Sequence, residues 1–166
     1  MLIIFGGRSG TGKTALSRAL ARHLDAVHVR IDTIEEAIAN DSSSSIGGVG
    51  YRVGYAVAED NLRLGRIVVA DSVNPLDVTR DAWRSVADRA GVPSIEVEIV
   101  CSDTVEHRRR VEQRVVVQTL SWQEVVAREI QPWTRDHIVI DTAGRTIEDC
   151  LAQLTAAIAA RGLPAS

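Results

Sequence analysis

The feature that most constrains this chain is the segment GRSGTGKT at residues 7–14, directly after the apolar opening MLIIFG. Three of its eight residues are glycine, so the segment offers little side-chain surface to a hydrophobic core. Glycine-rich loops of this kind let backbone N–H groups come close to a bound anion. We therefore expect a phosphate-binding loop at the first turn of the fold.

The segment matches the P-loop pattern GxxxxGK[ST]. In a P-loop the lysine contacts the β- and γ-phosphates of a nucleoside triphosphate, and the hydroxyl after it binds Mg²⁺. Lys13 and Thr14 hold these two positions. The residues expected to surround the triphosphate are Gly7, Ser9, Gly10, Thr11, Gly12, Lys13, Thr14 and Ala15.

The same letters also match the dinucleotide-binding pattern GxGxx[GA], through Gly10, Gly12 and Ala15. Asp32 then falls about where such a protein keeps its ribose-binding acid. This alternative leaves no role for the lysine and the threonine of the segment. We therefore favour the P-loop, and with it a nucleoside triphosphate as the ligand.

Short β-branched runs alternate with longer helical patterns along the chain, which is typical of βαβ units on a parallel sheet. The expected strands are 2–5, 27–31, 66–70, 94–100 and 137–140. Helices are expected after the glycine loop, around 34–38, over 51–64, over 77–90 with Val78 and Trp83 inward, from Asp103, over 122–130 and over 147–160. We predict an α/β, three-layer P-loop NTPase or nucleotide-kinase-like fold with a five-stranded parallel sheet, as one domain over 1–166.

Composition narrows the class of ligand. The net charge of −3 argues against a general nucleic-acid or membrane-surface binder, and no apolar run approaches the length of a membrane span. The two cysteines and four histidines show no spacing typical of metal ligands. We expect a cytoplasmic protein whose partners are small molecules, and the sequence leaves its oligomeric state open.

The order of motifs resembles the small P-loop kinases, a family that includes chloramphenicol phosphotransferase, gluconate kinase, adenylylsulfate kinase and the zeta toxins. The resemblance spans nearly the whole chain. It rests on the segments GRSGTGKT, HVRID, VVADSVN, HRRRVEQR and IDTAG. It implies an enzyme that uses ATP and Mg²⁺ to transfer the γ-phosphoryl group to a hydroxyl of a small molecule.

In those kinases the acid at the end of the second strand faces the acceptor hydroxyl, and Asp32 matches that position. A carboxylate there can orient the hydroxyl and take its proton late in the transfer. Asp32 could instead cap the following helix. The family often has Arg three residues later, where this chain has Glu35, which argues against a phosphorylated acceptor held by a positive charge at that point.

The segment VVADSVN is similar to a Walker B strand followed by a substrate-facing loop. The resemblance assigns Asp71 to Mg²⁺, through water, and Asn74 to the substrate. Tyr51, with Arg52 and Tyr55, is a further candidate for the acceptor pocket. These three residues could equally form an exposed helical face.

The resemblance also implies a lid, approximately over residues 108–121, that carries an RxxxR pair. Arg110 and Arg114 reproduce the pair, with one expected over the adenine and the other on the transferring phosphates. Arg108 and Arg109 are possible substitutes, because the helix phase is uncertain from sequence. A salt-bridged surface helix with Glu106 and Glu112 is the alternative. Thr142 and Gly144 of IDTAG resemble the loop beside the adenine, or form a simple helix entry turn.

Other functions stay open at this point. A nucleotide-dependent ATPase or switch would share the P-loop but lack an acceptor. A nucleoside or polynucleotide kinase would need a basic groove or an aromatic sandwich, which the sequence does not reveal. A GTPase is disfavoured because the guanine motif NKxD is absent.

Overall fold

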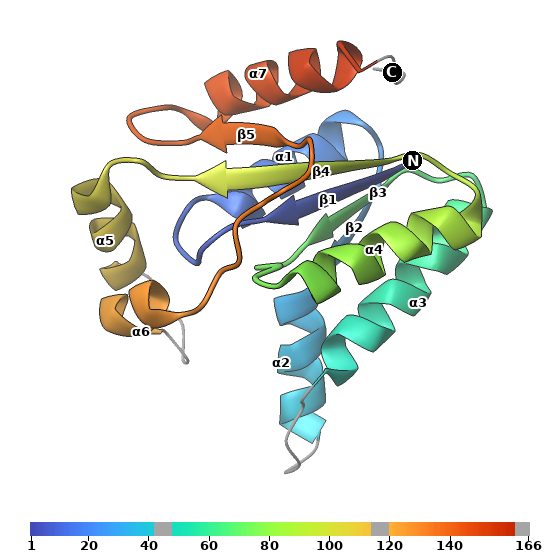
Figure 1. The fold of residues 1–166 in the computed structure, drawn as a ribbon, viewed down its shortest axis with the longest axis horizontal. Helices are drawn as coiled ribbons and strands as arrows, with labels where there is room; N and C mark the ends of the chain where they lie inside the picture. The colour runs from blue at the N-terminus through green and yellow to red at the C-terminus, as the bar shows by residue number, and fades with distance from the viewer. Residues whose placement is uncertain (42–47, 114–119, 162–166) are drawn as a thin grey trace.

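A computed structural model describes residues 1–41, 48–113 and 120–161 of the chain. Its centre is a parallel sheet with the strand order β2-β3-β1-β4-β5 (Figure 1). The strands are β1 (Leu2–Gly6), β2 (Val27–Arg30), β3 (Val68–Asp71), β4 (Ser94–Val100) and β5 (Ile138–Asp141). Because all the strands run the same way, their carboxyl ends meet at one edge of the sheet.

Helices cover both faces of the sheet and surround its carboxyl edge. The helices are α1 (Lys13–His23), α2 (Ile31–Asp41), α3 (Val49–Arg63), α4 (Asp77–Ala90), α5 (Thr104–Glu112), α6 (Trp122–Ala127) and α7 (Ile147–Ala159). In Figure 1, α7 lies on one side of the sheet and α3 and α4 on the other, while α5 and α6 lie beyond the strand tips. The result is the three-layer α/β fold that the sequence predicts.

Two apolar clusters hold the layers together. On one face, Leu16 and Leu20 of α1 and Leu154 of α7 pack against strand residues such as Ile3 and Val97. On the other face, residues of α3 and α4 pack against the opposite sides of β1, β2 and β3. Fully burying an aliphatic side chain contributes about 1.5–3 kcal/mol, so this double core fixes where the carboxyl ends of the strands lie.

Most predicted elements are confirmed, with shifts at their ends. Strand β4 and helix α4 have the predicted bounds, whereas the predicted helix over 122–130 ends at Ala127. The prediction that Asp32 ends the second strand is wrong, because the strand ends at Arg30 and Asp32 lies in the first turn of α2. An acidic side chain there is favoured by the positive end of the helix dipole.

The inward face predicted for α4 is also partly wrong. Val78 is 67% exposed, whereas Arg80 is 1% exposed. Arg80 donates to the backbone carbonyls of Gln131 and Pro132, and its guanidinium lies 4.6 Å from the Trp133 ring centroid. A buried arginine thus ties α4 to the segment after α6.

Within the described residues, the helices are too short or too polar to cross a membrane.

Candidate active site

The loop between β1 and α1 has the backbone shape of a P-loop. Gly7, Gly10 and Gly12 all have positive φ, at 129°, 87° and 93°. A Cβ on Gly7 would lie 2.2 Å from the carbonyl oxygen of Ile99, so the loop packs directly on strand β4. Positive φ and this close approach explain why glycine stands at these positions.

Lys13 is turned back over the loop. Its side chain is 7% exposed, and its Nζ donates to the carbonyl oxygen of Arg8 at 2.9 Å. The Thr11 hydroxyl donates to the same oxygen, also at 2.9 Å. A buried ammonium needs such oxygen partners, and the phosphate oxygens of a nucleotide are stronger ones.

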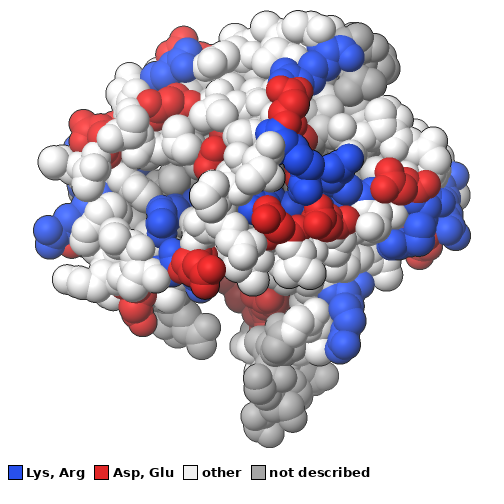
Figure 2. Space-filling view, in the orientation of Figure 1, with Lys and Arg blue, Asp and Glu red and all other residues white. Residues whose placement is uncertain are grey.

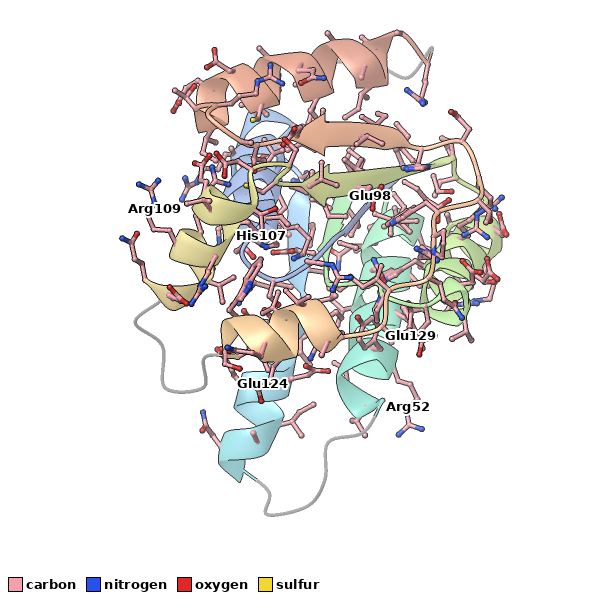
Figure 3. All side chains as sticks on the ribbon, turned by 60° about the vertical axis from the view of Figure 1, so that its left-hand side comes forward. Arg52, Glu98, His107, Arg109, Glu124 and Glu129 are labelled. Atoms are coloured by element: carbon pink, nitrogen blue, oxygen red, sulfur yellow. The ribbon has the colours of Figure 1, made fainter. Side chains whose placement is uncertain are left out.

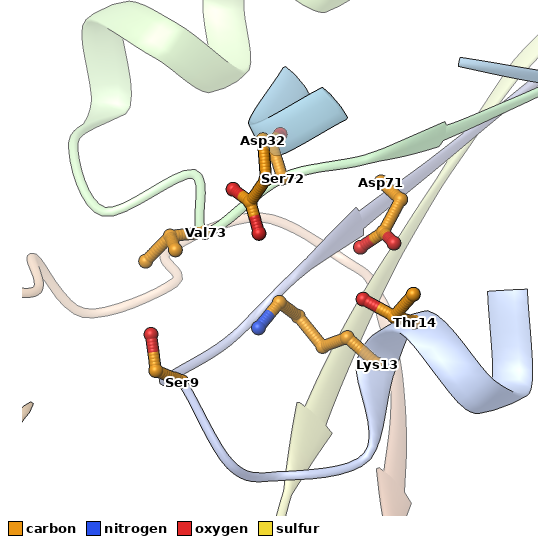
Figure 4. Close-up of a pocket in the computed structure, with 7 residues that line it drawn as sticks. All are labelled: Ser9, Lys13, Thr14, Asp32, Asp71, Ser72 and Val73. Atoms are coloured by element: carbon orange, nitrogen blue, oxygen red, sulfur yellow. The ribbon is translucent and has the colours of Figure 1, made fainter. Parts of the chain in front are cut away.

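A cavity beside the P-loop joins residues from three parts of the sequence (Figure 4). In that view the Thr14 hydroxyl lies beside the Asp71 carboxylate, and the Asp32 carboxylate lies beside Ser72. The lining residues are Ser9, Lys13, Thr14, Asp32, Asp71, Ser72 and Val73. Five of the predicted site residues therefore meet in one place, and Ser72 and Val73 are additions that the sequence did not single out.

Asp71 is the most buried acid of this cavity, at 2% exposed. Its Oδ2 lies 3.7 Å from His28 Nε2 and 3.9 Å from Arg30 Nε, and it makes no hydrogen bond. Burial lowers the pKa of His28, against the opposing effect of Asp71. A buried carboxylate oxygen without a hydrogen bond, beside the hydroxyl of Thr14, fits the oxygen donors that Mg²⁺ requires.

Asp32 is more open, with 53% of its side chain exposed. Its Oδ2 pairs with Arg30 Nη2 at 2.8 Å. Thr33 also contacts Arg30, because the Thr33 hydroxyl accepts from Nη1 at 3.1 Å. The structure thus places the Asp32 carboxylate in the cavity and pairs it with a residue that sequence reasoning missed.

We call the carboxyl ends of β2 and β3, the residues that directly follow them and the neighbouring parts of α2 and α3 the acceptor side. Burial raises the pKa of Glu35, and the neighbouring charge of Asp32 adds to this while Arg128 opposes it. Glu35 packs closely on Gly50, where a Cβ would lie 2.4 Å from its Cγ. Burial likewise raises the pKa of Tyr51, which lies close enough to Ser72 for that hydroxyl to reduce the shift.

Two of the predicted substrate residues do not line the cavity. Asn74 is fully buried, with φ of 48°, and its Nδ2 donates to the carbonyl oxygen of Phe5 at 2.7 Å. Tyr51 contacts Tyr55, whose ring stands edge-on to Trp83 with 4.7 Å between centroids. Both residues support the acceptor side from behind.

We call the P-loop, α5 and the loop after β5 the nucleotide side. Arg110 Nη1 donates to the Thr142 hydroxyl at 2.7 Å, and Nη2 donates to the Thr142 carbonyl oxygen at 2.9 Å. The Thr142 hydroxyl in turn donates to the Thr11 carbonyl oxygen at 2.8 Å. Arg110 Nη2 also pairs with Glu106 at 2.7 Å, as the salt-bridged alternative expects, and the side chain is fixed above Gly12. Arg114 lies outside the described residues.

The remaining arginines of α5 face away from the P-loop. Arg108 pairs with Glu112, and Arg109 points outward while His107 points inward (Figure 3). The backbone N–H of Gly144 donates to Glu106, and this hydrogen bond lowers the pKa of Glu106. A hollow of about 380 Å³ opens here, lined by Asp103, Val105, Glu106, Arg109 and Gly144.

Sequence reasoning missed two residues that tie the P-loop to α5 and α6. His107 Nε2 lies 2.8 Å from the carbonyl oxygen of Ser9. Arg8 Nη1 donates to the carbonyl oxygens of Val125 and Arg128 at the end of α6. Both contacts span about a hundred residues or more, and a loop arginine or a helical histidine gives no local signal of them.

Solved structures of other proteins share this fold. A protein of Chloroflexus aurantiacus J-10-fl described as a candidate kinase superposes with a TM-score of 0.74 at 20% identity, over 92% of this chain and 95% of that one. The adenylylsulfate (APS) kinase CysC of Mycobacterium tuberculosis, in complex with AMPPNP and APS, has a TM-score of 0.71 at 18% identity, over 95% of this chain and 96% of that one. A gluconokinase of Sinorhizobium meliloti 1021 has a TM-score of 0.69 at 17% identity, over 96% of this chain and 91% of that one.

At such identities these structures show the fold alone. Among curated proteins, none matches the sequence. A family model described as an AAA domain matches residues 2–136, which include the P-loop and every strand but β5. The chain therefore belongs to this AAA-domain family and has the ATP-binding P-loop fold of the small kinases.

Proposed function

We propose that the protein is a Mg²⁺- and ATP-dependent phosphotransferase that acts on a hydroxyl of a small molecule. The observation that carries the proposal is the cavity beside the P-loop, where Lys13 and Thr14 face Asp32 and Asp71. Phosphoryl transfer requires positioning and charge neutralisation more than covalent chemistry. A lysine, a buried acid and an open acid around one small space are suited to those tasks.

On the nucleotide side, Lys13 would exchange the Arg8 carbonyl oxygen for the β- and γ-phosphates. Backbone N–H groups of the P-loop would hold the same phosphates. Arg110 sits over Gly12 and would contribute positive charge, with Arg114 as its predicted partner in a lid. The hollow beside Gly144 would receive the adenine.

Thr14 and Asp71 are the residues that would hold Mg²⁺, directly or through water. The ion would supply neutralisation of the charge on the phosphates. Asp32 would accept a hydrogen bond from the acceptor hydroxyl, align its oxygen with the γ-phosphorus and take its proton. Because Asp32 lies one residue into α2, its backbone is fixed by a helix instead of a loop.

The acceptor side indicates the class of substrate. Glu35 and Asp32 lie within one turn of α2, and the negative charge of Asp32 contributes to the raised pKa of Glu35. Because Arg30 is already paired with Asp32, and Arg128 is the cation that acts on Glu35, this pair leaves no unpaired positive charge on α2 to hold a phosphate or sulfate. We infer an acceptor without a phosphate or sulfate near the hydroxyl it presents.

Charge distribution bears on the polynucleotide alternative. Figure 2 shows Lys and Arg side chains next to Asp and Glu side chains over the face it presents, without a continuous basic stripe. Nucleic-acid backbones are usually held by such stripes. The face shown in Figure 2 therefore gives no support to a polynucleotide acceptor.

The proposal is tested by calorimetry of ATP and GTP binding with Mg²⁺, followed by ADP release with a panel of sugars, nucleosides, amino alcohols and antibiotics. We expect Lys13→Ala to lose nucleotide binding and turnover, because it removes the charge that neutralises the phosphates. Asp32→Asn should bind ATP like the wild type but lose turnover by about 100-fold or more, as expected for a general base. Arg161→Gln removes an exposed ion pair with Asp136 and serves as the control.

Each result separates the alternatives. Acceptor-stimulated ADP release identifies a kinase and its substrate class. Tight ATP binding with hydrolysis that no acceptor stimulates favours the ATPase or switch. Normal transfer by Asp32→Asn would contradict the role given to this acid, and absence of nucleotide binding by the wild type would contradict the proposal as a whole.

A further inference from the structure

The carboxyl end of β2 carries an arginine that touches both candidate acids. In the parallel register, Arg30 lies opposite Asp71 on the adjacent strand β3. The next residues begin α2, which brings Asp32 and Thr33 back toward the same guanidinium. One side chain therefore stands between the acid assigned to the acceptor and the acid assigned to the metal.

Each nitrogen of this guanidinium faces a different oxygen. Nη2 donates to Asp32 at 2.8 Å, Nη1 donates to Thr33 at 3.1 Å, and Nε lies 3.9 Å from Asp71 Oδ2. Both Nε and this Oδ2 are buried without a hydrogen bond. The planar guanidinium of Arg30 thus fixes the orientation of the Asp32 carboxylate and keeps a positive charge beside Asp71.

Asp32 depends on this contact for its orientation. More than half of its side chain is exposed, so packing alone does not select one rotamer. Aligning a reacting group matters for rate, because a displacement of about 1 Å can cost about 100-fold. An exposed ion pair contributes little to folding, about 0–1 kcal/mol, so stability alone is a poor explanation for Arg30.

On the basis of the proposed phosphotransferase function, we propose that Arg30 is a positioning residue, which aims Asp32 at the attacking oxygen and joins it to Asp71. The two acids then form one unit across the β2 and β3 ends. Lysine cannot replace this arrangement, because a single Nζ cannot reach Asp32, Thr33 and Asp71 in the directions of a guanidinium. The role concerns the transition state and leaves the binding of ground-state nucleotide to the P-loop.

The test uses MgADP alone and MgADP with fluoroaluminate, a planar mimic of the transferring phosphoryl group that needs no identified acceptor. Dissociation constants are measured by calorimetry for the wild type, Arg30→Gln, Arg30→Lys and the control Arg161→Gln. We expect every variant to bind MgADP within about threefold of the wild type. The gain in affinity from fluoroaluminate should fall about tenfold to 100-fold in Arg30→Gln and by less in Arg30→Lys.

A double-mutant cycle with Asp32→Asn identifies the route of the effect. If Arg30 acts through Asp32, the double variant Arg30→Gln, Asp32→Asn should lose no more of the fluoroaluminate gain than Asp32→Asn alone. Thermal unfolding of all variants shows whether the fold is kept. An effect that simply adds to that of Asp32→Asn would overturn the inference.

Other results overturn it as well. The inference is wrong if Arg30→Gln keeps the full fluoroaluminate gain, or if it loses MgADP affinity and thermal stability in parallel, as a structural defect would. It is also wrong if the wild type binds MgADP but gains nothing from fluoroaluminate, and nucleotide binding by the P-loop then still stands. A wild type that binds no nucleotide contradicts the proposed function itself.

Discussion

The nucleotide side and the acceptor side of the site differ in how their buried polar groups are paired. On the nucleotide side, the Thr142 hydroxyl meets Thr11 and Arg110, and Lys13 meets Arg8. On the acceptor side, four buried polar atoms have no hydrogen bond within the described part of the chain. These atoms are Arg30 Nε, Asp71 Oδ2, Ser72 Oγ and Asn74 Oδ1.

A buried polar atom without a partner costs about 1–3 kcal/mol. Such atoms persist where a ligand or metal later pairs with them, and two of the four, Asp71 Oδ2 and Ser72 Oγ, belong to residues that line the cavity. On the nucleotide side, these polar groups are therefore already hydrogen-bonded within the protein. On the acceptor side, several buried polar atoms still lack a hydrogen bond. The difference teaches that the folded chain pairs its buried polar groups unevenly around the site.

The largest expected effect comes from Gly7→Ala, which tests how rigid the nucleotide side is. The new Cβ would lie 2.2 Å from the Ile99 carbonyl oxygen, at a φ of 129°. Overpacking costs about 1–3 kcal/mol and an unfavourable positive φ about 1–2 kcal/mol, so the free energy of unfolding should fall by about 3 kcal/mol. Urea unfolding measures the change.

Gly65→Ala is the matched control. Gly65 also has a positive φ, of 80°, but nothing lies within 4 Å of its Cβ position. Only the conformational cost of about 1–2 kcal/mol should remain. Equal losses in the two variants would show that the contact of the P-loop with β4 is not tight.

A second pair of variants compares the two sides directly. Thr142→Val removes a hydroxyl that bonds to Thr11 and Arg110, so the free energy of unfolding should fall by about 1–3 kcal/mol. Ser72→Ala removes a buried hydroxyl that lies near Tyr51 without a hydrogen bond of normal geometry, so stability should change by less than about 0.5 kcal/mol. Nucleotide binding should weaken in the first variant alone. The reverse order of stability would contradict the contrast between the two sides.

The smallest expected effect is pH-dependent and concerns Glu35. Burial and Asp32 raise the pKa of Glu35 above its ordinary value of 4.5, so the folded state resists ionisation of this group. The resulting loss of folding stability is absent below pH 4.5 and grows as the pH rises through the pKa that Glu35 has in the folded protein. Glu35→Gln should therefore stabilise the protein slightly at pH 7 and not at pH 4, in thermal unfolding.

Glu36→Gln removes an exposed carboxylate from the next position of α2 and is the control for charge alone. A stabilisation that is equal for both variants, or equal at both pH values, would contradict the burial of Glu35. Substrate choice can be tested with Glu35→Gln as well. The rates of ADP release with a cationic and with a neutral form of one amino alcohol would be compared between this variant and the wild type.

The sequence predicts the sheet and the glycine loop after β1 well, for physical reasons. Buried strands such as Ser94–Val100 are apolar runs, and a P-loop needs glycines and a lysine at fixed spacing. Asp71 was expected to end the third strand, and β3 ends there, because a polar residue that ends a buried strand stands out. Local patterns therefore suffice wherever one short segment performs one task.

The acceptor side was predicted less well because its contacts join separate segments. Arg30 was overlooked because its three partners lie on α2 and β3, and only the fold brings them together. Asp32 was assigned to a strand because HVRID continues the apolar alternation, yet the helix begins one residue earlier. Arg80 was missed since a buried arginine, paired with carbonyls, violates the usual burial pattern.

Arg8 links the P-loop of this protein to α6. Its guanidinium donates to the carbonyl oxygens of Val125, Val126 and Arg128 at the end of α6, and its own carbonyl oxygen accepts a hydrogen bond from Lys13. A loop transplanted from another P-loop protein, with a different residue after the first glycine, would still present its amides to phosphate. It would leave the end of α6 without its donor, so the phosphate-binding loop of this chain is not an interchangeable module.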